Sequence, residues 1–159
     1  EALTALADTL NSGSRVAFLG VGSPLRGDDA VGLYLLEGLK ARLSSLPGER
    51  FQFYRGESAP ENFTGVIREF APAHLVILDA AELGEAPGSF RRINPEDIAE
   101  VSFTTHILPL KILVAYFNKV MNCEILIIGV QPQHLEFATT LSSTVQKAAD
   151  DFLEELLRI

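Results

Sequence analysis

Cysteine is almost absent from this 159-residue chain, which contains only Cys123. A single cysteine excludes an internal disulfide framework and fits a reducing compartment. No apolar run reaches the roughly 20 residues that a membrane-spanning helix needs, so we expect no membrane insertion. The chain begins without a basic region followed by an apolar core. We therefore expect no signal peptide and a cytoplasmic location.

Basic residues are also scarce: 13 Lys and Arg stand against 21 Asp and Glu, for a net charge of −8. A nucleic-acid partner needs a basic face, so we expect none, and an anionic membrane surface is equally disfavoured. The apolar fraction of 47% is ordinary for a globular protein. We find no repeat, low-complexity tract or linker, so we expect one domain spanning residues 1–159.

Apolar runs and helical apolar patterns alternate along the chain. The runs predict strands at 15–19, 51–54, 75–78, 89–93 and 124–128, and the patterns predict helices at 2–10, 29–43, 58–70, 109–118 and 140–157. Such alternation favours parallel pairing with right-handed crossovers. We predict an α/β three-layer sandwich, with a mostly parallel twisted sheet of about five strands and helices on both faces. At least one edge strand is expected to be antiparallel, and the arginine-bearing run 89–93 is predicted to be peripheral.

No serine or cysteine stands out as a nucleophile. Ser58 and Glu61 have the spacing of a capping box, which explains Ser58 as the N-cap of a helix. Cys123 precedes the strand at 124–128, so we expect it in the core, at the amino end of the sheet. Nucleophilic catalysis by either side chain is therefore not favoured.

The glycine-rich turn at 19–32 connects the first predicted strand to a helix and carries Asp28 and Asp29. Such turns usually bind phosphate through backbone N–H groups. Here the third glycine of a dinucleotide fingerprint is missing, and the two aspartates stand where a phosphate loop has Lys and Ser/Thr. Carboxylates indicate a cation site instead. Helix capping explains one aspartate more easily than two, so we assign Asp28 to a cap or supporting role and direct Asp29 towards the site.

Asp79 directly follows the apolar run 75–78. A carboxylate next to buried aliphatic residues is costly unless it is paired or binds a metal. The alternative is that Asp79 caps the turn at 80–82. Because ligands bind beyond the carboxyl ends of parallel strands, we expect Asp79 and Asp29 to lie at one edge of the sheet.

Three histidines are available to complete such a site. His74 precedes its strand and is expected at the surface, far from the site. His134 follows a strand and is kept in reserve, and His106 lies in the connection before the helix at 109–118. Two carboxylates and one imidazole would leave open positions on a borderline divalent metal such as nickel, zinc, manganese or iron. On the residues alone, His106 completes this set only if Asp29 and Asp79 define a metal site.

Several segments together resemble the [NiFe]-hydrogenase maturation endopeptidases, and most of all the branch that serves hydrogenase-3-type, formate-hydrogenlyase-like enzymes. The turn at 20–32 resembles the family's glycine-rich motif, and the resemblance extends in order along nearly the whole chain. The other segments are Gly56-Glu57-Ser58-Ala59-Pro60-Glu61-Asn62, Ile77-Leu78-Asp79-Ala80, Thr104-Thr105-His106 and Gly129-Val130-Gln131-Pro132.

The resemblance implies an endopeptidase that removes a C-terminal extension from the [NiFe]-hydrogenase large-subunit precursor after nickel insertion. The family's metal-binding trio matches Asp29, Asp79 and His106, so these three are the expected catalytic and metal-binding residues. Nickel would be carried by the substrate, with other divalent metals able to substitute in vitro, and we expect the enzyme to be a monomer. Ser23 and Ala30 depart from the residues common in the family, Asn and Gly, and neither departure removes a ligand.

Three alternatives stay open at this stage. Asp29 and Asp79 could act as an acid–base pair without a catalytic metal. The trio could belong to a non-catalytic nickel-binding chaperone or sensor. A flavodoxin-like nucleotide or flavin binder is the third possibility, although the aspartate pair opposes it.

Overall fold

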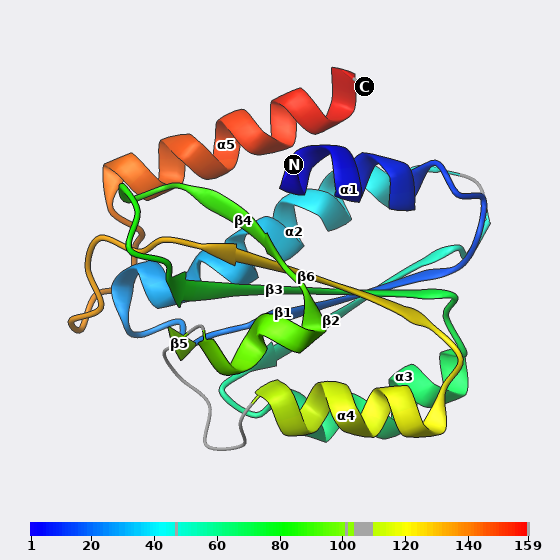
Figure 1. The fold of residues 1–159 in the computed structure, drawn as a ribbon. Coiled ribbons are helices and arrows are strands. Elements are labelled where there is room, and N and C mark those ends of the chain that lie inside the picture. Colours follow the sequence, from blue (N-terminus) through cyan, green and yellow to red (C-terminus); the bar gives the residue numbers. More distant parts are fainter. Residues whose placement is uncertain (47, 101, 104–109, 159) are drawn as a thin grey trace.

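The fold is a twisted sheet with helices on both faces, as predicted (Figure 1). The computed structural model describes residues 1–46, 48–100, 102–103 and 110–158. In these ranges the elements are α1 (Ala2–Leu10), β1 (Val16–Val21), η1 (Gly27–Ala30), α2 (Val31–Leu43), β2 (Phe51–Glu57), η2 (Pro60–Phe63), α3 (Thr64–Phe70), β3 (His74–Glu82), β4 (Phe90–Ile93), η3 (Pro95–Glu100), β5 (Ser102–Phe103), α4 (Leu110–Val120), β6 (Glu124–Val130) and α5 (Ser143–Arg158).

The strands form the order β2-β1-β3-β6-β4, with the short β5 pairing with β3. The pairs β1–β2, β1–β3 and β3–β6 are parallel. β4 pairs antiparallel with β6 and lies at the end of this order, which confirms the predicted antiparallel edge. β1 and β3 are neighbours, so their carboxyl ends share one edge of the sheet.

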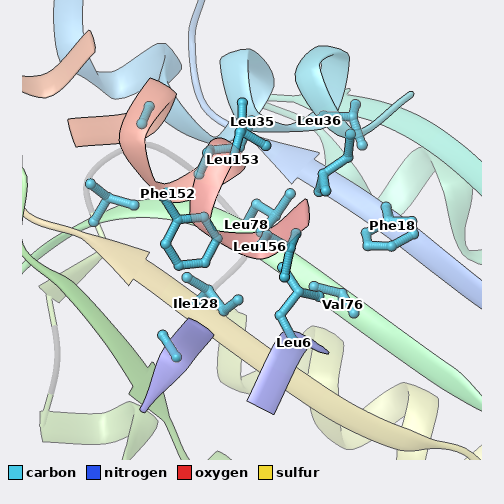
Figure 2. Packing of buried hydrophobic residues seen from close by; sticks show 14 of the residues in the cluster. Leu6, Phe18, Leu35, Leu36, Val76, Leu78, Ile128, Phe152, Leu153 and Leu156 are labelled. Carbon is cyan, nitrogen blue, oxygen red and sulfur yellow. The ribbon is translucent and has the colours of Figure 1, made fainter. Parts of the chain in front are cut away.

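Each face of the sheet has its own apolar cluster. α1, α2 and α5 cover one face, where Leu6, Phe18, Leu36 and Leu156 pack together with Leu78 (Figure 2). α3 and α4 cover the opposite face, where residues of β1 and β3 pack against Ile67, Leu113 and Phe117. This covering explains why the central strands are apolar without alternation. Among the described residues, no helix is both long and apolar enough to span a membrane.

Several element boundaries differ from the predictions. The capping box is wrong: the helical segment starts as a 3-10 turn at Pro60, and neither η2 nor α3 has a side-chain cap. The helix predicted from residue 29 begins as the 3-10 turn η1 and becomes α-helical at Val31. The last helix starts at Ser143 rather than residue 140, and β5 was not predicted. Two residues are too few to produce a periodic signal.

Candidate functional site

Asp79 occupies a special position in the centre of the sheet. β3 does not end at residue 78, as predicted, but continues to Glu82 and pairs with β6 beyond that point. Its pairing with β1 nevertheless stops at the Gly20–Leu78 pair, so Asp79 is the first residue of β3 past the β1 neighbour. Its side chain is fully buried. By strand alternation it shares the face of Ile77 and Ala81, which belong to the apolar cluster beneath α3 and α4.

The turn after β1 folds back to hold Asp29. Gly22 has a φ of 132°, and a Cβ on it would lie 1.9 Å from the carbonyl oxygen of Asp29, so only glycine fits there. The backbone N–H of Ser23 donates to Oδ2 of Asp29 at 2.7 Å. Asp29 is fully buried. Ser23 also supports the turn with its side chain, since its Oγ accepts from the N–H of Leu25 at 3.2 Å.

Gly32 in the first turn of α2 brings this segment against the sheet. A Cβ on Gly32 would lie 2.2 Å from the carbonyl oxygen of Leu78 and 2.7 Å from that of Val21. The helix start therefore touches the backbone of β1 and β3 at the edge where Asp79 lies. η1, which carries Asp29, contacts β3 as well. The two candidate carboxylates thus come from segments that meet at the carboxyl edge of the central strands.

Asp28, the neighbour of Asp29, is also fully buried but serves another purpose. Its Oδ2 accepts from the N–H of Gln133 at 2.8 Å, the N–H of His134 at 3.0 Å and the hydroxyl of Ser142 at 2.8 Å. Its Oδ1 accepts from the N–H of Ser142 at 2.7 Å. Burial alone would raise the pKa of Asp28, but these hydrogen bonds outweigh it and lower the pKa below its ordinary value.

The role of Asp28 is thus supporting, as predicted, but it is not a cap of its own helix. Its four hydrogen bonds tie the turn after β1 to the loop after β6 and to the start of α5. Residue spacing contains no signal for this, because the donors are more than 100 positions away in the chain. Three of the four donors are backbone N–H groups, which do not depend on the side chain at that position.

Gln131 is a second supporting residue that sequence reasoning did not single out. It is 5% exposed, and its Oε1 accepts from the N–H of Leu83 at 2.6 Å. Its Nε2 donates to both carboxylate oxygens of Glu82 at 3.1 Å. Gln131 therefore fixes the end of β3 to the end of β6. The available signal was its place directly after a buried strand, within the segment Gly129-Val130-Gln131-Pro132.

The turn does not present its amides to a phosphate. The N–H of Ser23 donates to Asp29, that of Gly27 to Ala138 O, that of Asp28 to His134 O and that of Asp29 to Arg26 O. These groups are used inside the protein, whereas a phosphate loop points its amides at the ligand. The geometry therefore agrees with the interpretation of a carboxylate-bearing turn.

The histidines take different places. His106 lies outside the described residues. The side chain of His134 is 61% exposed and lies 3.8 Å from Glu136, so the loop contributes to the turn through the backbone of His134. His74 begins β3 at the far edge, as predicted, but its side chain is only 19% exposed and lies 3.8 Å from Glu124, so it is less exposed than expected.

Cys123 immediately precedes β6 and is partly buried against the cluster under α3 and α4. This confirms the predicted location at the amino end of the sheet. Burial raises the pKa of its thiol, which disfavours the reactive thiolate.

The metal-binding capacity of this edge depends on groups beyond Asp29 and Asp79. Among the residues that the structure describes, no group of three His, Cys, Asp or Glu side chains is placed to hold a metal ion. The two buried carboxylates supply oxygen donors that suit a divalent cation. A complete ligand set needs additional donors, from residues outside the described ranges or from a substrate.

Comparisons with known proteins identify the family. A family profile described as HycI, hydrogenase maturation protease, matches residues 34–159. The hydrogenase 3 maturation protease of Escherichia coli K12 is 34% identical over 137 residues, which cover 86% of this chain and 85% of that protein.

Two solved structures share the fold over most of its length. The crystal structure of a [NiFe] hydrogenase maturation protease HycI from Thermococcus kodakarensis superposes with a TM-score of 0.81 at 28% identity, covering 98% of this chain and 99% of that one. The solution structure of the endopeptidase HycI from Escherichia coli has a TM-score of 0.75 at 34% identity, covering 89% and 88%. The chain therefore belongs to the hydrogenase maturation protease family and is an endopeptidase.

Proposed function

We propose that this endopeptidase removes the C-terminal extension of a [NiFe]-hydrogenase large-subunit precursor after nickel insertion, and that Asp29, Asp79 and His106 recognise the nickel. One observation carries the proposal: Asp29 and Asp79, both fully buried, come from segments that meet at the carboxyl edge of β1 and β3. Carboxylate oxygens are ligands that suit a divalent cation. A substrate that carries its own nickel would supply that cation.

Two carboxylates and the imidazole of His106 would leave open positions on a divalent metal, which suits a metal that arrives on its substrate with ligands of its own. Asp29 and Asp79 contribute two oxygen donors, and the precursor contributes the ligands that already hold its nickel. Binding of the nickel at this edge then places the adjacent peptide bond at the site, and such orientation lowers the activation barrier. Hydrolysis adds water across that bond. We propose that the nickel would polarise either the attacking water or the carbonyl group of that bond.

Ser23 and Gly22 contribute to this function by holding the carboxylate of Asp29. The hydrogen bond from the N–H of Ser23 keeps Oδ2 of Asp29 in one orientation, and Gly22 allows the turn to approach the backbone of Asp29. The carboxylate is therefore ordered before a substrate binds, which reduces the entropy cost of coordination.

The test measures shortening of nickel-loaded precursor by intact mass, with the wild type and with Asp29→Asn, Asp79→Asn and His106→Ala. We expect each variant to fold, as judged by circular dichroism, and to lose at least about 100-fold in processing rate, the scale of losing a key catalytic group. Glu82→Gln is the matched control, because it removes a carboxylate from the same strand and keeps an oxygen acceptor for Gln131. It should process at the wild-type rate. Full activity in all three trio variants would show that the trio is wrongly assigned.

A further inference from the structure

The loop between β6 and α5 is joined to the turn that carries Asp29 by backbone pairing. The N–H of Gly27 donates to Ala138 O at 3.0 Å, and the N–H of Ala138 donates to Leu25 O at 3.0 Å. Arg26 and Ala138 form a parallel bridge. The two segments therefore lie side by side like a short piece of parallel sheet.

This pairing places two large apolar side chains next to each other at the surface. Leu25 and Phe137 each stand one residue before the bridged pair, and parallel register puts such residues on the same side of the two segments. Leu25 is 52% exposed and Phe137 is 78% exposed. Phe137 is the most exposed large apolar side chain in the part of the chain that the structure describes.

The loop is held in this position by more than the bridge. The carboxylate of Asp28 accepts the N–H groups of Gln133 and His134 and both donors of Ser142. Gly27 has a φ of 55°, and a Cβ on it would lie 2.8 Å from His134 O, so the loop backbone sits closely on the turn. Phe137 is thus held at the surface by a fixed segment. Exposure of its apolar ring to water is unfavourable in free energy.

The position of this pair relative to Asp29 suggests its occupant. Leu25 is four residues before Asp29 in the same turn, and the loop of Phe137 is bonded to Asp28, the residue next to Asp29. The apolar pair therefore belongs to two segments that are bonded directly to the candidate site. It is available to residues that flank the scissile bond of a polypeptide bound at that site.

We propose that Leu25 and Phe137 form a docking surface for the precursor polypeptide next to its scissile bond, and that they accept a large apolar side chain of that polypeptide. The proposal rests on the proposed function, because the occupant is the precursor. It adds residues that contribute to substrate affinity and do not touch the reacting atoms. Burial of apolar surface on binding supplies the attraction.

The experiment measures equilibrium binding of nickel-free precursor to the wild type, Phe137→Ser and Leu25→Ser. The nickel-free form is the probe because the proposed function leaves it uncut. Both side chains are exposed, so the variants should keep the wild-type unfolding midpoint. We expect each variant to raise the Kd about tenfold, the effect of losing one buried apolar side chain at an interface.

Leu157→Ser is the matched control. Leu157 is 54% exposed, similar to the 52% of Leu25. It lies near the C-terminal end of α5, about 20 Å from the start of that helix by helix rise. Its Kd should equal that of the wild type. The proposed docking surface would be refuted if the wild type and the three variants had equal Kd values. It would also be refuted if Leu157→Ser raised the Kd as much as Phe137→Ser and Leu25→Ser do. Failure of the wild type to shorten nickel-loaded precursor would instead overturn the proposed function, and the binding comparison would still decide on the surface.

Discussion

At the residue scale, two adjacent aspartates take different tasks. Asp28 accepts four hydrogen bonds with both of its oxygens and joins three segments of the chain. Asp29 is oriented by the turn itself, through the N–H of Ser23. A carboxylate suits the position of Asp28 because it accepts only, and every partner there is a donor. Asparagine would direct an NH₂ group at some of these donors.

Asp28→Asn is therefore expected to destabilise the fold by about 3 kcal/mol at pH 7, since a hydrogen bond to a charged group contributes roughly 1.5–3 kcal/mol. The fold lowers the pKa of Asp28, so its stabilisation is complete above the ordinary value of about 4 and is lost as the pH falls through the lowered value. Urea unfolding of Asp28→Asn and the wild type at several pH values should show a difference in the free energy of unfolding that narrows below about pH 4.

Asp151→Asn is the control for this prediction, because Asp151 forms an exposed pair with Lys147 on α5. It should leave the urea midpoint near that of the wild type. The role of Asp28 would be contradicted if the free energies of unfolding of Asp28→Asn and the wild type were equal at pH 7. It would also be contradicted if their difference stayed constant down to pH 2.

At the element scale, the start of α2 and the strands β1 and β3 determine where the site forms. Gly32 lets the first turn of α2 rest directly on the carbonyl oxygens of Leu78 and Val21. η1 directly precedes α2, so this contact also places Asp29 near the edge where the pairing of β1 with β3 stops. The position of the site therefore depends on one close contact between helix and sheet backbone.

Gly32→Ala is expected to cost about 3 kcal/mol, because its Cβ would lie 2.2 Å from a backbone oxygen and the helix must move away. Processing of the precursor should fall as well, since Asp29 moves with the helix start. Gly65→Ala makes the same chemical change in α3 with nothing within 4 Å, and should gain up to about 1 kcal/mol from helix propensity. Equal unfolding midpoints for the two variants would refute the close contact.

The sequence predicted those features that depend on local pattern. The five main strands, the parallel core and the antiparallel edge follow from apolar runs and connection rules, and the structure confirms them. The boundary errors arise where tertiary contacts override local preference. Ser58 and Glu61 match a capping box, yet the chain turns at Pro60 and places no side-chain cap there. β3 continues past Asp79 because β6 still pairs with it.

The site was predictable only in part. Asp29 and Asp79 could be selected because both follow apolar runs of parallel strands, whose carboxyl ends meet at one edge. The hydrogen bonds of Asp28 and Gln131 could not, since their partners, most of them backbone groups, are distant in the chain and brought together only by folding. The trio of Asp29, Asp79 and His106 remains a prediction, and His106 lies outside the described residues.

At the scale of the whole molecule, the apolar clusters that stabilise the fold and the candidate site residues occupy different parts of the sheet. Two apolar clusters, one on each face, hold the helices, and the candidate carboxylates occupy the carboxyl edge between them. The exposed pair Leu25 and Phe137 lies beside that edge. A large substrate can therefore approach this edge without disturbing either cluster.

The most direct measurement of the central claim compares nickel-loaded and nickel-free precursor as substrates of the same folded enzyme, with precursor mass followed over time. We predict that nickel-loaded precursor loses its C-terminal extension, and that nickel-free precursor keeps its full mass, because the trio has no metal to recognise. Processing of both forms at equal rates would contradict nickel recognition and favour an acid–base pair of Asp29 and Asp79. Failure to shorten either form would contradict the assigned substrate.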